Sequence, residues 1–416
     1  MRRDAARLVA VMGAVALLLA SCGGSSKSAS SGTTTVTSAT TTTSTTTTAP
    51  PQTTPTTVPP RWSALPAAPI AGRVAGMAVW TGTEVLVWGG VIRKGAPNPT
   101  VAMAGDGAAY DPRTRTWRVL APAPSGVLGD GGYAAAWTGD EAVFWVGNSP
   151  SGPVGGAVYD PARNTWRRLS PGPLTSSREG YLSVWTGTEL LIMGGNSGDG
   201  PASPVAAAVN PRTGSWRLLP AFNRFPGLRL AGVTWNGHDL YGSGTYSLCP
   251  QLGSACHNTP SVFFAFDPAT GGLQRFDLAH APQSSLAVIG SSGTDVVLAT
   301  TGPARPRIVG YDPSTGVWSE GPTAPCAVDL TAYTQSFWFD GRYAVGCSPS
   351  GLEIYDPSTD AWSVLDAGPS PLSSRDGSAI AWTGSELIAW SGIVREPYNP
   401  TPDDGSAIVL PASGTD

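Results

Sequence analysis

Short apolar runs recur along the chain in pairs, and each pair is joined by a turn that contains an x-Gly dipeptide. AVWTGTEVLVWGG, which begins at Ala78, and SVWTGTELLIMGG, which begins at Ser183, are clear examples. The x-Gly dipeptide supplies the positive φ that a tight two-residue hairpin needs. We therefore predict seven hairpins of strands a and b, which begin at Ala78, Ala135, Ser183, Gly232, Val288, Ser336 and Ile380.

A second hairpin follows six of these seven, with sequences such as YDPRTRTW from Tyr110 and YDPSTGVW from Tyr311. The Asp or Asn side chain can start the turn, and the proline presets φ at the next position. We predict strands c and d on either side of these turns. Four residues after the Asp or Asn, a left-handed residue is expected, at Arg115, Asn164, Gly214, Gly271, Gly316 and Asp360.

Each unit of about 50 residues therefore holds four antiparallel strands, and sheets of this kind stack radially as the blades of a propeller. The seventh unit stops after a single strand, SAIVL from Ser406, and lacks its outer strand. RWSAL, Arg61–Leu65, resembles the missing strand and stands alone at the start of the repeats. The predicted fold is an all-β, seven-bladed propeller whose last blade is closed by the N-terminal strand Arg61–Leu65.

The repeats resemble kelch repeats, which carry a diglycine after the second strand and an aromatic residue seven positions before a Trp. Gly89-Gly90 with Tyr110 and Trp117 fits this pattern, whereas later units lose the diglycine. The resemblance covers Arg61 to about Ala412 and is closest to the seven-bladed central domain of galactose oxidase. It implies that ligands bind at the face of the d–a and b–c loops.

The residues before Arg61 resemble those of a bacterial lipoprotein. The apolar run Leu8–Ala20 fits a secretory signal and is too short to span a bilayer. Leu19-Ala20-Ser21-Cys22 resembles a lipobox, which implies lipidation of Cys22 and an extracytoplasmic protein anchored to the outer face of the bacterial cell membrane. An ordinary signal peptide with an incidental cysteine is the alternative. We expect a signal peptide at 1–21, a disordered Ser/Thr/Pro-rich tether at 22–60 and the propeller at 61–416.

Composition argues against a nucleic-acid ligand. The chain has a net charge of −4, charged residues are only 13% of the total, and Lys27 and Lys94 are its two lysines. A mildly acidic protein gains little from contact with phosphates.

Arginines recur in the predicted d–a loops at Arg73, Arg178, Arg229 and Arg375. A ring of guanidinium groups around the channel would suit the capture of a carboxylate or another anion. The alternative is structural, with each Arg donating hydrogen bonds to carbonyls of neighbouring loops. Arg93 and Arg395 lie in the long b–c loops of blades 1 and 7, which adjoin across the closure and could form one rim.

The sequence gives weaker support to a catalytic function. The likeness to galactose oxidase would imply a copper site with two His ligands, but the chain has three histidines in all and no suitable ligand spacing. A kelch-type sialic acid epimerase is a second precedent, for which Arg178-Glu179 and Arg375-Asp376 could supply acid and base. We assign no catalytic residue and expect no metal and no cofactor.

Four cysteines besides Cys22 allow three pairings. We expect disulfides between Cys249 and Cys256, which bracket one loop, and between Cys326 and Cys347, which belong to one blade. Free thiols are the alternative.

These features favour a monomeric, surface-anchored, non-catalytic module that binds a glycan, a peptide or a partner protein. A sugar-acting enzyme is the alternative.

The lipobox hypothesis predicts that Cys22→Ala moves the protein from the membrane fraction to a soluble or uncleaved pool, because acyl chains would supply nearly all of its membrane affinity. Fractionation and acyl labelling measure this, and unchanged labelling of the variant contradicts the assignment.

Overall fold

The computed structural model describes most of one compact unit, Thr53–Asp416. The described residues are 56–58, 61–95, 100–128, 134–146, 155–170, 172–174, 179–196, 206–225, 228–248, 257–258, 261–278, 281, 285–301, 305–327, 336–347, 351–365, 375–394 and 401–410. In this part of the chain, no helix has the length and apolar character needed to cross a membrane.

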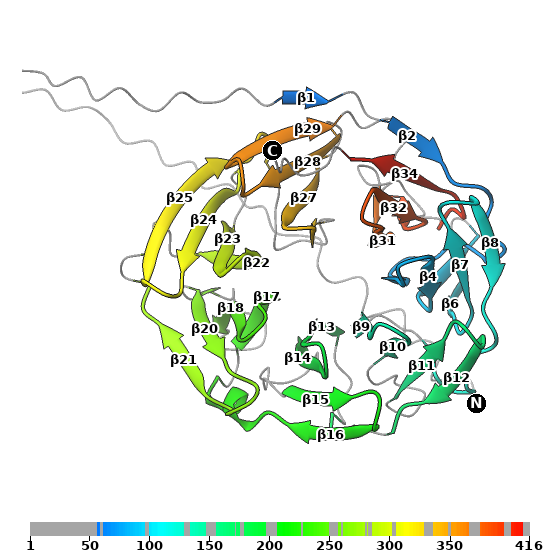
Figure 1. The fold of residues 1–416 in the computed structure, drawn as a ribbon, viewed down its shortest axis with the longest axis horizontal. Helices are drawn as coiled ribbons and strands as arrows, with labels where there is room; N and C mark the ends of the chain where they lie inside the picture. Colours follow the sequence, from blue (N-terminus) through cyan, green and yellow to red (C-terminus); the bar gives the residue numbers. More distant parts are fainter. Residues whose placement is uncertain are drawn as a thin grey trace, which may run out of the picture. The chain divides into compact units, whose positions relative to one another are not determined.

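Seven antiparallel sheets form a ring, so the predicted seven-bladed propeller is confirmed (Figure 1). Blade 1 consists of β3 (Met77–Trp80), β4 (Val85–Trp88), β7 (Gly107–Asp111) and β8 (Thr116–Val119). Blade 2 consists of β9 (Ala134–Trp137), β10 (Ala142–Trp145), β11 (Gly156–Asp160) and β12 (Thr165–Arg168). Blade 3 consists of β13 (Glu179–Trp185), β14 (Leu190–Asn196), β15 (Ala206–Asn210) and β16 (Ser215–Leu218).

The second half of the ring follows the same plan. Blade 4 consists of β17 (Leu228–Trp235), β18 (Leu240–Leu248), β20 (Val262–Phe266) and β21 (Leu273–Phe276). Blade 5 consists of β22 (Leu286–Ser292), β23 (Asp295–Thr300), β24 (Arg307–Asp312) and β25 (Val317–Thr323). Blade 6 consists of β26 (Ser336–Phe339), β27 (Arg342–Cys347), β28 (Gly351–Asp356) and β29 (Ala361–Leu365).

The N-terminal strand closes the ring, as the half-repeat predicts. Blade 7 contains β31 (Ala379–Trp382), β32 (Glu386–Trp390) and β34 (Gly405–Val409), and its outer strand is β2 (Arg61–Ala64). Trp62 lies opposite Ile408 in an antiparallel register. Leu65 follows the strand, and its backbone N–H donates to the carbonyl of Gly405 at 2.9 Å.

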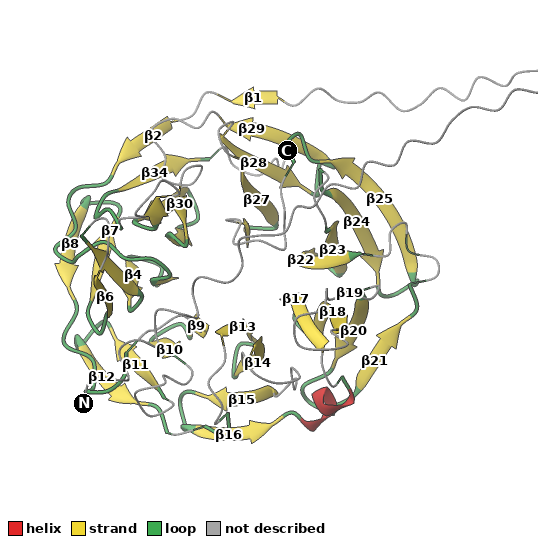
Figure 2. Ribbon diagram, turned by 180° about the vertical axis from the view of Figure 1, so that it is seen from behind, coloured by secondary structure: helices red, strands yellow, loops and turns green. Residues whose placement is uncertain are grey.

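The predicted tether needs a correction at its C-terminal end. Residues Thr56–Val58 form β1, which pairs in parallel with β29 and adds a fifth strand to blade 6. Seen from behind, β1 lies along the outside of β29 (Figure 2). Composition alone cannot reveal such a strand, because addition to a free sheet edge depends on backbone hydrogen bonds rather than on apolar side chains.

Smaller elements extend the blades. The hairpin of β5 (Val91–Lys94) and β6 (Thr100–Met103) rises from blade 1, and β30 (Arg375–Asp376) pairs with β33 (Ile393–Val394) beside blade 7. The strand β19 (His257–Asn258) pairs with β18, and a short 3-10 helix, η1 (Pro220–Arg224), follows β16.

The hydrophobic core is divided among the seams, by which we mean the interfaces between neighbouring blades. Each of seven described clusters of buried residues combines side chains from two adjacent blades. Between blades 1 and 2, for example, the ring of Trp88 in blade 1 lies 5.4 Å from Trp166 and 5.5 Å from Phe144 in blade 2. A blade is thus stable only when it is packed against both neighbours.

The strand-d tryptophans also connect the blades by hydrogen bonds. The indole N–H of Trp166 donates to the carbonyl of Ala121, at the end of the preceding blade, at 2.8 Å. Trp117 bonds Pro66 and Trp216 bonds Ser170 in the same way, each at 3.0 Å. The Trp row in the sequence therefore has a structural role.

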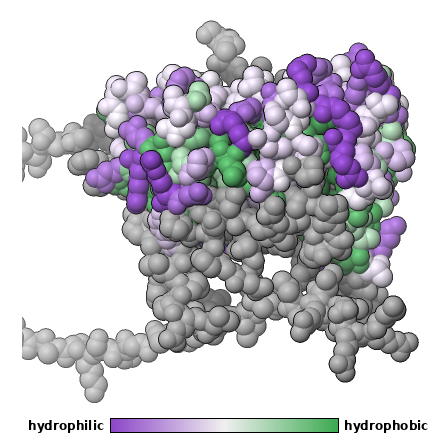
Figure 3. Space-filling view, turned by 90° about the horizontal axis from the view of Figure 1, so that it is seen from below, coloured by the Kyte–Doolittle hydropathy of each residue, from purple (hydrophilic) through white to green (hydrophobic). Residues whose placement is uncertain are grey.

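The c–d turns adopt the expected conformation. A positive φ occurs at all six predicted positions, including the arginine in the first of them, Arg115, where φ is 55°. The surface of the ring is mixed in character. From the side shown in Figure 3, hydrophilic residues alternate with small apolar areas over the described part.

The closing strand predicts an asymmetry between two deletions. Removal of residues 61–69 should lower the stability by about 3 kcal/mol or more, because Trp62 no longer packs between blades 6 and 7 and β34 becomes a free edge. Removal of residues 23–52, which precede β1, should leave the melting temperature unchanged. Thermal unfolding of both variants is the test, and equal tolerance of the two deletions would show that β2 does not hold the ring together.

Candidate ligand-binding groove

Arg73, the first of the arginines singled out in the sequence, has a structural role. Its side chain is 0% exposed, and its guanidinium group donates to the carbonyls of Ala71, Gly89 and Asp106 at 3.0 to 3.2 Å. The same group forms an ion pair with the carboxylate of Asp106 at 2.8 Å. The structural alternative therefore describes Arg73, because a buried and partnered guanidinium group does not meet a ligand.

Arg375 is also engaged within the protein. Its side chain is 12% exposed, and Nη1 lies 2.7 Å from Oδ1 of Asp404. Arg73 and Arg375 both bond Ser391 at the seam between blades 7 and 1. Arg229, by contrast, is exposed on β17 in blade 4. The structure does not bring these three arginines together around one anion, and Arg178 lies outside the described residues.

The predicted rim of blades 7 and 1 is supported at one point. The hydroxyl of Thr401 in blade 7 accepts a hydrogen bond from the backbone N–H of Arg93 at 3.3 Å and donates to the carbonyl of Arg93 at 3.2 Å. The two loops therefore touch as expected. Arg395, Cys22, Cys249 and Cys256 lie outside the described residues. Cys326 is disulfide-bonded, and since no side chain is described for Cys347, both pairings stay predictions.

A repeated ion pair occupies the turn end of the first three blades, where the a–b and c–d turns lie. The Arg that follows the strand-d Trp forms a two-pronged contact with the Glu that ends the a–b turn. Arg118 bonds Glu84 at 2.8 and 2.5 Å, Arg167 bonds Glu141 at 3.3 and 2.6 Å, and Arg217 bonds Glu189 at 3.0 and 2.7 Å. Such planar pairs fix geometry and fill space.

The seam between blades 2 and 3 shows how little room these pairs leave. Besides the Arg167–Glu141 pair, Arg212 in the c–d turn of blade 3 reaches Asp140 of blade 2 at 3.5 Å. The cavity at this turn end has a volume of 370 Å³ and is lined by Glu141 and Arg212 among others.

The seam between blades 4 and 5 lacks both arginines. By strand register, Gln274 stands where blade 2 has Arg167, and Ser314 stands where blade 3 has Arg212. The corresponding groove has a volume of 910 Å³. Two large side chains have been replaced by small ones, and the seam is open at its turn end.

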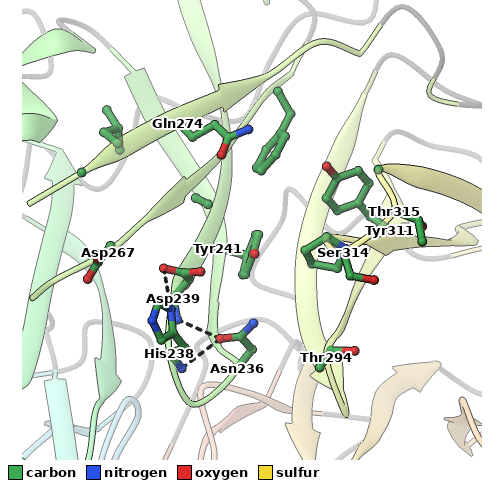
Figure 4. Close-up of a pocket in the computed structure, with 16 residues that line it drawn as sticks. Asn236, His238, Asp239, Tyr241, Asp267, Gln274, Thr294, Tyr311, Ser314 and Thr315 are labelled. Carbon is green, nitrogen blue, oxygen red and sulfur yellow. Dashed lines mark hydrogen bonds and ion pairs between the residues drawn. The ribbon is translucent and has the colours of Figure 1, made fainter. Parts of the chain in front are cut away.

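Aromatic rings, uncharged polar groups and two carboxylates line this groove (Figure 4). Tyr241 and Phe276 from blade 4 are nearly parallel, with centroids 6.3 Å apart, and Phe276 lies 5.1 Å from Tyr311 of blade 5. In the view of Figure 4, Asp239 and Tyr241 lie on one side, with Ser314 and Thr315 on the other. Further polar lining residues are Asn236, Gln274 and Thr294.

Asp239 gives one side of the groove its negative charge, and hydrogen bonds within its own a–b turn hold it in place. The side-chain oxygen of Asn236 accepts the backbone N–H groups of His238 and Asp239 at 3.0 and 2.8 Å. Nδ1 of His238 lies 3.1 Å from Oδ1 of Asp239. Burial, and then the charge of Asp239, raise the pKa of Tyr241 to about 12, and burial raises the pKa of Tyr311. Both phenol groups therefore remain protonated hydrogen-bond donors at neutral pH.

The sequence did not predict this groove, because the resemblance to kelch repeats placed ligands at the face of the d–a and b–c loops. His238 lies in an a–b turn, on the other face. The sequence carried only a partial signal, since the Arg after the strand-d Trp is present in blades 1 to 3 and is replaced by Gln274, Ser319 and Ser363 in blades 4 to 6.

Comparison with known proteins assigns no family. No protein-family model matches the chain, and no curated protein matches it. The structure establishes the fold, which is a seven-bladed β-propeller.

Proposed function

We propose that this protein is a non-catalytic recognition module that binds a glycan in the groove between blades 4 and 5. The observation that carries the proposal is the 910 Å³ groove at this seam, where Gln274 and Ser314 stand at the two arginine positions and Phe276 is partly exposed among polar side chains. Binding sites commonly combine apolar and aromatic walls with a few placed polar groups.

The chemistry of the lining suits a sugar. A pyranose ring has an apolar face of C–H groups that packs on aromatic rings, and the partly exposed ring of Phe276 offers such a surface, backed by the buried rings of Tyr241 and Tyr311. Its hydroxyl groups both donate and accept hydrogen bonds. Gln274, Ser314 and the protonated phenols match them as donors and acceptors. An extended ligand could follow the groove along the seam.

The sequence resemblance to lipoproteins supports a proposal for the location of the module. We propose a kelch-type propeller that is exported, lipidated at Cys22 and held on the outer face of the membrane by the segment before β1. Binding of an extracellular glycan is consistent with such a location.

A sugar-acting enzyme has no specific observation in its favour among the described residues. Of the acid and base pairs suggested by the sequence, Arg375 is engaged by Asp404, and Arg178 and the side chain of Glu179 are not described. In the groove, the His238 side chain is 80% exposed and lies at the rim. Exposure of this kind does not provide the desolvated setting in which acid–base groups are tuned.

Gln274→Arg is the direct test of the proposed function. The introduced arginine should pair with Asp239, as Arg167 pairs with Glu141, and fill the groove while it preserves the fold. We expect the signal of the full-length protein on a glycan array to fall at least about tenfold, equivalent to about 1.4 kcal/mol, with no loss of melting temperature.

Ser319→Arg is the matched control, because Ser319 holds the same strand-d position in blade 5 and lines no part of this groove. The control should keep the full array signal. Equal signals from the wild-type protein and Gln274→Arg would refute the groove as the binding site.

A further inference from the structure

The groove has a one-sided distribution of charge. Its lining contains two carboxylates, Asp239 and Asp267, and neither lysine nor arginine. His238 is the one lining residue that can become positive, and its Nδ1 already faces Asp239. The charge that a ligand meets in this seam is therefore negative or neutral, in contrast to the anion site that the arginine row suggested.

The two carboxylates differ in their availability. Asp267 is occupied by its own turn, where it accepts hydrogen bonds from the N–H of Ala269 at 2.8 Å and from the hydroxyl of Thr270 at 2.5 Å. The Thr270 hydroxyl is the main reason that the pKa of Asp267 is lowered, so this group stays charged. Asp239 has one described side-chain partner and is 26% exposed at the groove. It is the carboxylate that a ligand can reach.

The aromatic rings also favour a positively charged ligand. The faces of Tyr and Phe rings carry negative electrostatic potential and attract cations. Tyr241 lies close enough to Asp239 for the aspartate charge to act on its phenol. A ligand that presents both an apolar ring face and a positive charge would use both features at once.

We infer that the groove selects glycans built from sugars with a free amino group, with the ammonium group placed at Asp239 and a sugar ring packed on the partly exposed ring of Phe276. This inference rests on the proposed function and specifies its ligand class. Acidic glycans are disfavoured, because like charges brought together at a partly buried site repel each other.

Three tetrasaccharides test the inference with the full-length protein by isothermal titration calorimetry. The probes are a glucosamine tetramer, its N-acetylated counterpart and a galacturonate tetramer, used at about pH 6, where carboxylates are ionised and amines are charged. We expect the glucosamine tetramer to bind at least tenfold more tightly than the N-acetylated one, and the galacturonate tetramer to bind most weakly. Added salt should reduce the preference.

Asp239→Asn should remove most of this preference by weakening the glucosamine tetramer about tenfold while it changes the N-acetylated tetramer little. The matched control is Asp140→Asn, which removes one charge from the equivalent turn of blade 2 and should leave both affinities unchanged. A change with the control as large as with Asp239→Asn would point to net charge and overturn the inference.

The remaining outcomes distinguish failure of the inferred preference for amino sugars from failure of the proposed glycan-binding function. If the N-acetylated tetramer binds as tightly as the amine or more tightly, and Gln274→Arg abolishes that binding, the charge preference is wrong and the glycan site stands. If none of the probes binds, or if Gln274→Arg leaves binding intact, both proposals fail.

Discussion

Packing at the seams is the constraint on which this structure depends. A four-stranded blade has two faces, and neither is covered by the blade itself. Each described hydrophobic cluster is shared by two neighbouring blades, so every face is covered only when the ring is closed. The strand β2 has this role for blade 7, where Trp62 packs against the cluster shared with blade 6 and Leu65 against the cluster shared with blade 1.

The seams differ in how their turn ends are filled, and this difference creates the candidate site. Between blades 2 and 3, arginine and glutamate side chains occupy the space and leave 370 Å³, whereas Gln274 and Ser314 leave 910 Å³ between blades 4 and 5. The hydrophobic cluster deeper in this seam is retained, with Tyr241, Phe263 and Tyr311 among its members. The ring can therefore open one end of one seam without losing the packing that closes it.

The closing seam shows a different departure from the repeat. Ser63 of β2 stands where Arg118 stands in blade 1, while Arg61 on the same sheet lies across Val409 from Glu386 of blade 7. Among the described residues, the buried Oε2 atom of Glu386 and the hydroxyl of Tyr110 have no hydrogen-bond partner. Arg115 crosses the seam instead and bonds the Ser63 hydroxyl at 3.2 Å and the carbonyl of Ala64 at 2.5 Å. At the closing seam, an arginine of blade 1 therefore contacts the N-terminal strand directly.

The repeat predicted the fold because periodic features report on structure that every blade shares. The x-Gly turns, the Asp-Pro turns and the Trp row placed the strands, and the missing outer strand of blade 7 identified Arg61–Leu65 as the closure. The same periodicity misled the search for a site. Arg73 and Arg375, two members of the arginine row, connect loops within the protein, and the groove lies on the other face, where Gln274 and Ser314 stand at positions that hold arginines in earlier blades. The pairing of β1 with blade 6 could not be predicted, since a three-residue strand without apolar periodicity carries no pattern.

Amide hydrogen exchange with and without the glucosamine tetramer tests the central claim most directly, namely that the open seam is where a ligand binds. The claim predicts ligand-dependent protection in residues 236–241 of blade 4 and 311–316 of blade 5, and no change in the equivalent turns of blades 2 and 3, residues 138–143 and 209–214. Protection confined to other parts of the ring, with the seam between blades 4 and 5 unaffected by the bound ligand, would contradict it.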